Sequence, residues 1–361
     1  TLVLGGDGRP RVTYYDATQG DLKYAYEDGS GWQMRVLDAD GVVGSYSAQA
    51  MFTSVTYPIS TTPVYTDYVH IGYYDAANGA VKYALLDGNA VAPTIEIVDD
   101  QGDAGQFVSV ARSPTYGSLV QPYLSYYVAD TGDLRCAWWD GAAWVTKTLE
   151  TDGDVGQYTS LDIDPNAQLH LSYYDATDGD LRYAWFESGR WFTQTVDATG
   201  NVGQHCILQT ALATYSLTGT TQSYYCPHII YYDATNGAIK HAAKVKTATD
   251  YSWHIETLAH IDSPDPAAAF AMARNRYLHL LYGRGDALRY AHQEIAGSID
   301  VAWHDEAIAQ RSEVGDAGWY TSIAQDQWAR PHISYQDRAR YHLKHAYYDG
   351  WRWFVETVDD E

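Results

Sequence analysis

This sequence of 361 residues is poor in cysteine and in basic residues, and it contains no long apolar run. Its three cysteines, Cys136, Cys206 and Cys226, form no Cys-x-x-Cys or Cys/His spacing of the kind that binds structural zinc. An antiparallel hairpin would place Cys206 and Cys226 near opposite ends, too far apart for a disulfide, so we expect free thiols. No segment reaches the roughly 18 apolar residues of a membrane span, and we expect no membrane insertion.

Positive charge is scarce as well. The chain has 23 Lys and Arg against 46 Asp and Glu, a formal net charge of −23. Such a chain repels nucleic acid and anionic lipid, and no basic run offsets this, so we expect no nucleic-acid partner. The phosphate-binding G-x-x-x-x-G-K-[ST] motif, the G-x-G-x-x-G fingerprint and the G-x-S-x-G nucleophile elbow are also missing.

What the sequence does contain is one phrase repeated seven times: a Leu-like residue, a basic residue, usually an aromatic one, and Ala. The basic positions lie 47 to 59 residues apart and are Lys23, Lys82, Arg135, Arg182, Lys240, Arg289 and Lys344. A repeat of this length, built from short alternating segments, indicates a radial or solenoid array.

The fourth copy shows the content of one repeat. Alternating segments at 158–163, 169–174, 181–186 and 191–196 are separated by turns rich in Asp, Asn and Gly. Four antiparallel strands repeated seven times predict an all-β, seven-bladed β-propeller.

We expect a single propeller domain over residues 1–361, in which both ends of the chain fall at a blade boundary and no strand is shared to close the ring. The predicted blades are 1–38, 46–99, 107–150, 158–197, 205–259, 266–310 and 320–361. Because the sequence opens at Thr1 without Met, we also expect it to be processed or part of a larger protein or assembly.

Hairpins of the form Asp-Gly-x-x-Trp follow several of the repeated phrases, at Asp28–Trp32 and Asp140–Trp144 and, shortened, at Asp349–Trp351. In this the whole chain resembles secreted β-propeller repeat proteins, particularly the propeller lectins. The resemblance implies an extracellular or cell-surface location and a glycan or protein ligand. Trp138, Trp139, Trp185 and Trp351 are the candidates for stacking on sugars. The Ser/Thr-x-Asp-x-Gly-x-Thr-Trp hairpin of sialidases is not present.

Two columns of polar residues recur at fixed repeat positions. Five Asp residues precede the turn that leads to a basic residue, and we expect cross-strand ion pairs Asp16–Lys23, Asp75–Lys82, Asp175–Arg182, Asp233–Lys240 and Asp337–Lys344. Five histidines open the second strand: His70, His170, His228, His279 and His332. Neighbouring blades hold these histidines too far apart to share a metal ion, so we expect packing between blades and a backbone hydrogen bond.

The turns between strands two and three and the connections between blades share one rim, and both are acidic. We predict a binding surface there, formed by Asp16, Asp21, Asp133, Asp175, Asp180, Asp233 and Asp286. Asp286 belongs to an Arg-Gly-Asp turn in blade six.

Crowded carboxylates also suit Ca²⁺, and Asp99, Asp103, Asp152 and Asp154 are the candidate ligands. The competing interpretation is that Asp and Gly form turns and keep the surface soluble, with no cofactor.

An active site needs an asymmetric cluster, and blades five and six depart most from the repeat. His205 replaces the Tyr or Phe of other copies, and His260, Asp262 and Asp265 replace the usual blade connection. If the protein is an enzyme, His205 and His260 are the candidate catalytic residues of a polysaccharide lyase or hydrolase.

Because no motif completes such a site, we favour a non-enzymatic extracellular module that binds a glycan or surface protein on its acidic rim. A purely structural role in a surface assembly is the third alternative.

Overall fold

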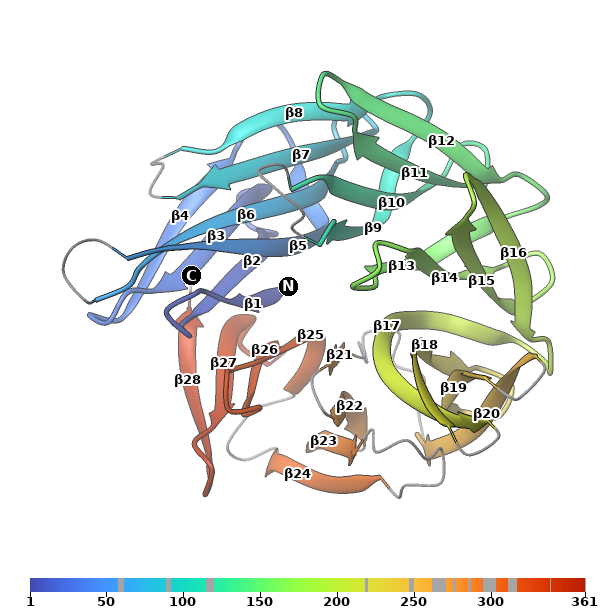
Figure 1. Cartoon of the computed structure of the whole chain (residues 1–361). Helices are drawn as coiled ribbons and strands as arrows, with labels where there is room; N and C mark the ends of the chain where they lie inside the picture. The colour runs from blue at the N-terminus through green and yellow to red at the C-terminus, as the bar shows by residue number, and fades with distance from the viewer. Residues whose placement is uncertain are drawn as a thin grey trace. The chain divides into compact units, whose positions relative to one another are not determined.

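The computed structural model of the chain describes residues 1–57, 62–88, 92–114, 120–217, 220–246, 250–261, 271–274, 277–284, 287–294, 303–310, 317–337 and 339–360. Within these ranges it forms seven four-stranded antiparallel sheets, each built from four consecutive strands (Figure 1). This is a seven-bladed β-propeller, as the repeat predicts, and no described sheet takes a strand from another part of the chain. No helix long and apolar enough to cross a membrane occurs among the described residues.

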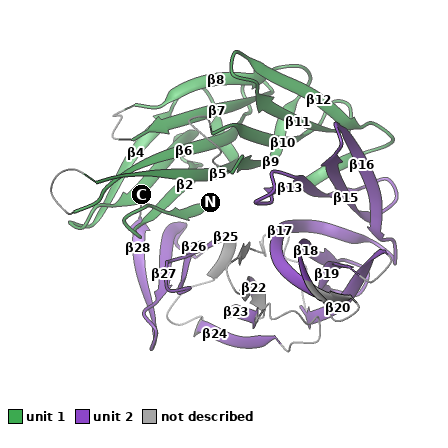
Figure 2. Ribbon diagram, viewed as in Figure 1, with its two compact units in different colours: residues 1–159 green, residues 160–361 purple. Residues whose placement is uncertain are grey.

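The chain divides into two compact units, residues 1–159 and 160–361 (Figure 2). The first unit contains blades 1 to 3 and the start of blade 4. The strands of blades 1 to 3 are β1 (Leu2–Leu4), β2 (Pro10–Asp16), β3 (Asp21–Glu27), β4 (Trp32–Asp38), β5 (Val43–Thr56), β6 (Val64–Asp75), β7 (Ala80–Asp87), β8 (Thr94–Asp99), β9 (Ala104–Arg112), β10 (Pro122–Val128), β11 (Asp133–Trp139) and β12 (Trp144–Glu150).

The second unit contains the remainder of blade 4 and blades 5 to 7. The strands of blades 4 to 7 are β13 (Val155–Ile163), β14 (Leu169–Asp175), β15 (Asp180–Glu187), β16 (Arg190–Asp197), β17 (Val202–Leu217), β18 (Thr220–Asp233), β19 (Ala238–Lys246), β20 (Tyr251–His260), β21 (Ala271–Arg274), β22 (Tyr277–Arg284), β23 (Ala287–Glu294), β24 (His304–Gln310), β25 (Ala317–Gln325), β26 (Pro331–Asp337), β27 (His342–Tyr348) and β28 (Trp353–Asp359).

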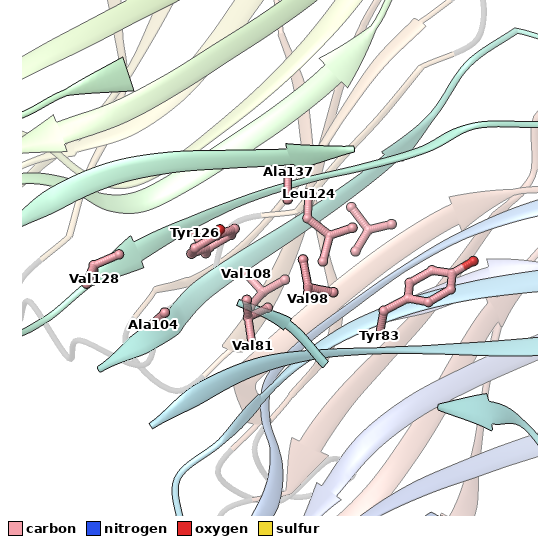
Figure 3. Close-up of a cluster of buried hydrophobic side chains, with 10 residues drawn as sticks. Val81, Tyr83, Val98, Ala104, Val108, Leu124, Tyr126, Val128 and Ala137 are labelled. Atoms are coloured by element: carbon pink, nitrogen blue, oxygen red, sulfur yellow. The ribbon is translucent and has the colours of Figure 1, made fainter. Parts of the chain in front are cut away.

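The hydrophobic core lies between facing sheets. In unit 1, side chains of blades 2 and 3 interdigitate, with Val81 on β7 close to Leu124 and Tyr126 on β10 (Figure 3). All three are fully buried. Each side chain of this size contributes about 1.5–3 kcal/mol through its removal from water. The apolar positions of the repeated phrase are therefore the positions that pack one blade on the next.

A polar contact also joins neighbouring blades, and we call it the interblade clamp. The carboxylate of Asp38, at the end of blade 1, accepts a hydrogen bond from Tyr73 Oη (2.7 Å) and pairs with Lys82 Nζ (2.7 Å), both in blade 2. Asp99 pairs in the same way with Tyr126 and Arg135, and Asp197 with Tyr231 and Lys240. Burial alone would raise the pKa of Asp38, but the bonds from Lys82 and Tyr73 hold it below its ordinary value.

The cross-strand ion pairs predicted from the repeat are present in four blades. The nitrogen-to-oxygen distances are 2.8 Å for Lys23–Asp16, 3.5 Å for Lys82–Asp75, 3.4 Å for Arg182–Asp175 and 3.7 Å for Lys240–Asp233. The prediction is wrong for blade 7, where Asp337 pairs with Arg340 and Lys344 bonds Thr357 Oγ1. In blades 2 and 5 the clamp carboxylate lies closer to the lysine than the predicted partner does.

Four of the histidines that open the second strands are buried and His332 is half-buried, but the expected backbone bond is wrong. Instead, each Nδ1 is hydrogen-bonded to a side chain that lies diagonally across on the third strand, two residues from the register partner of the histidine. His70 contacts Tyr83 Oη (2.6 Å) and His170 contacts Tyr183 Oη (2.7 Å). The remaining three pairs are His228–His241, His279–Tyr290 and His332–His345. In these five blades, the third position of the repeated phrase is therefore a hydrogen-bonding position.

The cysteines are buried free thiols in the structure. Cys226 is paired in register with Ala211, five residues along β17 from Cys206. The hairpin therefore separates the two sulfur atoms.

Removal of the clamp carboxylate should destabilise the fold. Asp38→Ala leaves Tyr73 Oη without its acceptor and Lys82 with only the longer contact to Asp75. We expect the free energy of unfolding to fall by about 3 kcal/mol. Urea denaturation followed by tryptophan fluorescence measures this. Asp152→Ala, at an exposed Asp, is the control, and equal midpoints for the two variants would contradict the clamp.

The buried histidines should make the protein sensitive to acid. Burial lowers the pKa of His70 from 6.5 to about 4. Between these two pH values His70 is protonated in the unfolded chain but neutral in the folded protein. Stability should therefore fall as the pH drops from about 6.5 to about 4, by about 3 kcal/mol for this residue. His70→Gln should flatten the dependence of the urea midpoint on pH, whereas His260→Gln, at an exposed strand end, should not. A parent and a His70 variant with identical pH slopes would refute this assignment.

Candidate functional site

An unusual backbone conformation recurs where the first strand of a blade begins. Five aromatic or imidazole residues have a positive φ of 49° to 54°: Tyr46, Phe107, Tyr158, His205 and Tyr320. Bulky L-residues rarely adopt this left-handed region, and such outliers concentrate at functional sites. They occupy one repeat position, so the conformation belongs to the blade design.

A β-bulge produces this conformation. The pairing of β5 with β6 shifts register between Val43 and Ser45 and again between Ser45 and Ala48. The residue two before Tyr46 is Gly44, which has φ +106° and passes so close to blade 1 that a Cβ there would lie 2.8 Å from Leu22 Cα. A glycine is needed at that point because the two backbones approach each other directly.

In unit 1 the three left-handed residues form a continuous row of rings, which we call the aromatic cluster. The ring centroids of Tyr46 and Phe107 are 4.9 Å apart, and those of Phe107 and Tyr158 are 4.6 Å apart. The rings are inclined at 54° and 51°, a tilted arrangement that such pairs favour over face-to-face stacking. Tyr46 is 44% exposed, so the row reaches solvent.

Acidic and amide side chains flank the aromatic cluster. Tyr74 Oη donates to Asp103, and Tyr127 Oη donates to Asp154 at 2.8 Å. Gln157 Nε2 lies 3.1 Å from the same Asp154 carboxylate, and Gln106 bonds Asp103 in the same manner. Burial, together with the bond to Asp154 and its charge, raises the pKa of Tyr127 to about 12, so the phenol remains a hydrogen-bond donor at neutral pH.

The site therefore combines an accessible set of aromatic rings with carboxylate oxygens and amide groups. Rings of this kind bind apolar faces or cations, and the polar groups accept or donate hydrogen bonds at their edge. No residue of the aromatic cluster is a nucleophile or an acid–base group that titrates near neutral pH.

His205 takes the corresponding place in unit 2. Burial lowers its pKa to about 4, so the imidazole is neutral at pH 7. The second candidate catalytic residue, His260, ends β20 and is exposed. Val202, Asp233, Ala238 and His260 lie opposite one another across the four strands of blade 5. Three strand spacings separate the two histidine-bearing strands by about 14 Å, so the two side chains belong to opposite edges of the sheet.

Three of the predicted binding aspartates serve the turns in which they lie. Asp16 Oδ1 accepts the backbone amides of Thr18 and Gln19, while Oδ2 pairs with Lys23. Asp175 and Asp233 likewise accept turn amides and pair with Arg182 and Lys240. These carboxylates are directed into the protein.

The other predicted binding residues are more open. Asp21, Asp133 and Asp180 begin third strands and are half-buried. Burial and the charges of Asp178 and Asp175 raise the pKa of Asp180. Asp286, like Asp262 and Asp265, lies outside the described residues.

The calcium candidates do not form one group. Asp99 is buried in the interblade clamp, Asp103 and Asp154 accept tyrosine hydroxyls, and Asp152 is exposed. Among the residues that the structure describes, no three His, Cys, Asp or Glu side chains are arranged to hold a metal ion.

Of the candidate stacking tryptophans, Trp351 is 90% exposed on a hairpin turn, whereas Trp138, Trp139 and Trp185 are half-buried. Sequence reasoning noticed the Tyr/Phe column only through its exception, His205. The signal for the aromatic cluster was the recurring Gly-x-aromatic tripeptide at 44–46, 105–107 and 156–158.

The sequence matches no protein-family model and no curated protein. Among solved structures, it resembles the polysaccharide lyase Uly1, with a TM-score of 0.50 and 10% identity over 97% of this chain and 88% of that one. It also resembles the Dos1 propeller (TM-score 0.48, 10% identity, 93% and 74% coverage). A further similar structure is an α-L-arabinofuranosidase of Fusarium graminearum with arabinobiose (TM-score 0.46, 11% identity, 80% and 87% coverage). At such identities the likeness is one of fold alone, and propellers of one fold carry unrelated functions.

The geometry of the bulge predicts that its glycines cannot be replaced. In Gly156→Ala, the new Cβ would lie 2.8 Å from Leu134 Cβ and 2.9 Å from its Cα, at φ +106°. We expect a loss of about 2–4 kcal/mol in the free energy of unfolding, from clash and strain together. Gly141→Ala is the matched control, because φ is +103° there and no atom lies within 4 Å. Urea denaturation compares the two variants; if their losses are equal, close approach plays no part.

Proposed function

We propose that this protein is an extracellular carbohydrate-binding module and that the aromatic cluster of unit 1 is its sugar-binding surface. The observation that carries the proposal is the row Tyr46–Phe107–Tyr158, in which each ring is held in a strained backbone conformation and Tyr46 remains open to solvent. Strained residues concentrate at functional sites, and a ligand that packs on these rings would compensate for the strain.

The chemistry of the surroundings favours a sugar over an apolar ligand. The C–H faces of a pyranose ring pack on aromatic rings, and its hydroxyl groups need acceptors and donors at the rim of the contact. Asp103 and Asp154 supply acceptors, and Gln106 and Gln157 supply amides, all within the network that borders the rings. An apolar ligand would displace water from these carboxylates and amides without offering them a further hydrogen bond, at a cost of about 1–3 kcal/mol for each group that loses one.

The charge of the protein narrows the class of glycan. With a net charge of −23, the surface disfavours uronate-rich or sulfated chains. We therefore infer a neutral or amino-sugar glycan as the ligand, presented on a secreted polymer or a cell surface. A protein partner of the same surface chemistry is the competing interpretation of the acidic rim.

The alternative of a polysaccharide lyase or hydrolase in blades 5 and 6 rests on His205 and His260. General acid–base catalysis places its two groups on either side of one reacting bond, which the register of blade 5 does not favour for this pair. The binding function therefore has better support than the enzymatic one. A purely structural role in a surface assembly is not supported by any particular group of residues described above.

The proposal predicts that an accessible ring of the cluster is needed for binding. Affinity electrophoresis of the protein in gels containing a soluble neutral β-glucan, glycol chitin or polygalacturonate identifies the glycan class. We expect retardation by at least one of the first two and none by polygalacturonate. Tyr46→Ala should weaken the interaction at least about tenfold, equivalent to about 1.4 kcal/mol.

The matched control is Tyr57→Ala, which removes a tyrosine that is 75% exposed in the same unit but lies outside the aromatic cluster. Equal mobility of the Tyr46 and Tyr57 variants, with unchanged urea midpoints, would remove the aromatic cluster from the binding site. An absence of retardation in every neutral and amino-sugar gel would overturn the carbohydrate proposal itself.

A further inference from the structure

A single lysine interrupts the repeat on the third strand of blade 5. Lys244 lies five residues after the start of the repeated phrase, on β19, and no other copy has a lysine or arginine there. The corresponding residues are Glu27, Leu86, Trp139, Phe186, Gln293 and Tyr348. A residue that departs from a repeat is not required by the blade itself and is a candidate for a specific role.

Four aromatic rings surround the ammonium group of Lys244, and we call them the aromatic cage. Its Nζ lies 4.1 Å from the ring centroid of Trp185 and 4.7 Å from that of Tyr183, both on β15 of blade 4. The centroids of Trp253 and Tyr251 on β20 are 5.8 and 5.9 Å away. Such rings attract a cation through their negative faces, so the cage binds a positive charge.

Lys244 differs from the basic residues of the repeated phrase in lacking a carboxylate within ion-pair distance. Lys82 and Lys240 each lie within 4 Å of two aspartates, whereas no Asp or Glu in the described part of the chain comes that close to Lys244 Nζ. The acidic groups whose charges act on Lys244 are Glu187, which accepts a hydrogen bond from Trp185 Nε1 at 3.3 Å, and Asp250.

The remaining titratable groups around the cage do not supply the negative charge that Lys244 lacks. Burial raises the pKa of the Cys226 thiol to about 12, so it is neutral at pH 7. Lys246 lies over the far ring, 5.1 Å from the centroid of Tyr251, and adds positive charge. Burial lowers the pKa of Lys244 to about 8, against the opposing charges of Glu187 and Asp250. About a fifth of the amine is then unprotonated at pH 7.4, compared with about one part in a thousand for an ordinary lysine.

We propose that Lys244 is a covalent modification site for small aldehydes and that the aromatic cage holds the product. The unprotonated Nζ attacks the carbonyl carbon, forming a C–N bond while the C=O π bond breaks and its oxygen takes up a proton. Loss of that oxygen as water gives an iminium ion. The balance is amine plus aldehyde plus one proton to iminium plus water, with no change of oxidation state.

The cage explains why aldehydes are the favoured class. An iminium nitrogen keeps the positive charge of the ammonium, so the cation–π attraction of the four rings persists in the product. Acylation would convert Nζ to a neutral amide and lose that attraction. The site depends on residues of unit 2 only and is independent of the carbohydrate proposal.

Reductive trapping tests the proposal. The whole protein is treated with glycolaldehyde and sodium cyanoborohydride at pH 7.4, where the hydride reduces the iminium to a stable secondary amine, and peptides are mapped by mass spectrometry. We expect Lys244 to be labelled at least about tenfold faster than exposed Lys147 on β12. The rate at Lys244 should rise up to about pH 8 and then level off, while that at Lys147 continues to rise.

Two variants show whether the aromatic cage is responsible. Trp185→Leu removes the nearest ring and admits water, and it should reduce the preference for Lys244 severalfold. Trp191→Leu, in the same sheet but outside the cage, should leave it unchanged. Native-state labelling of Lys244 no faster than that of Lys147 would overturn the proposal, as would full preference in a folded Trp185→Leu protein. An equal preference with an acetylating ester would refute the selectivity for aldehydes.

Discussion

A buried carboxylate at the end of one blade, neutralised by the next blade, provides the directional contact between sheets. Hydrophobic burial holds the faces together but has no preferred direction, so it tolerates sliding. Asp38, Asp99 and Asp197 each require a tyrosine hydroxyl and a cation at fixed positions on the neighbouring sheet. A carboxylate this deeply buried is stable only when both donors are in place, so the clamp sets the position of one sheet against the next.

The clamp is incomplete in the later part of unit 2. At the register position where Leu22 and Val81 pair with Asp38 and Asp99, Ile239 pairs with Ala259 and Leu288 with Ala309. Tyr282 and Tyr335 occupy the positions of the clamp tyrosines in the next blades, and neither has a clamp aspartate to bind. Asp305 bonds Tyr282 and Arg289, whereas Tyr335 Oη is buried with no partner among the described groups. At this register position, an Asp in blades 1 and 2 is replaced by an Ala in blades 5 and 6, and the clamp loses its carboxylate there.

The sequence was sufficient for the fold because period-2 strands and Asp/Gly turns recur in every copy, and one copy predicts the others. It was sufficient for Asp75–Lys82, since hairpin neighbours follow from local spacing. It could not predict Asp38–Lys82, because that pair joins two sheets whose lateral offset is set only when they pack. For the same reason the sequence suggested that the rim aspartates were available to a ligand. In the structure, turn amides and neighbouring cations occupy Asp16 and Asp175, and charge counts alone do not reveal these contacts.

The aromatic cluster was hidden for another reason. Strand alternation describes residues with β backbone angles, and a bulge with a left-handed residue breaks that alternation at the very position of the cluster. Core packing alone is a poor explanation for these rings, because Tyr46 is 44% exposed and its counterpart Tyr320 is 71% exposed. A fold gains little stability from a strained residue whose ring faces water. The bulge explains the backbone conformation of Tyr46 but not the presence of an exposed aromatic ring on it, and this exposed ring is the observation on which the proposed binding function rests.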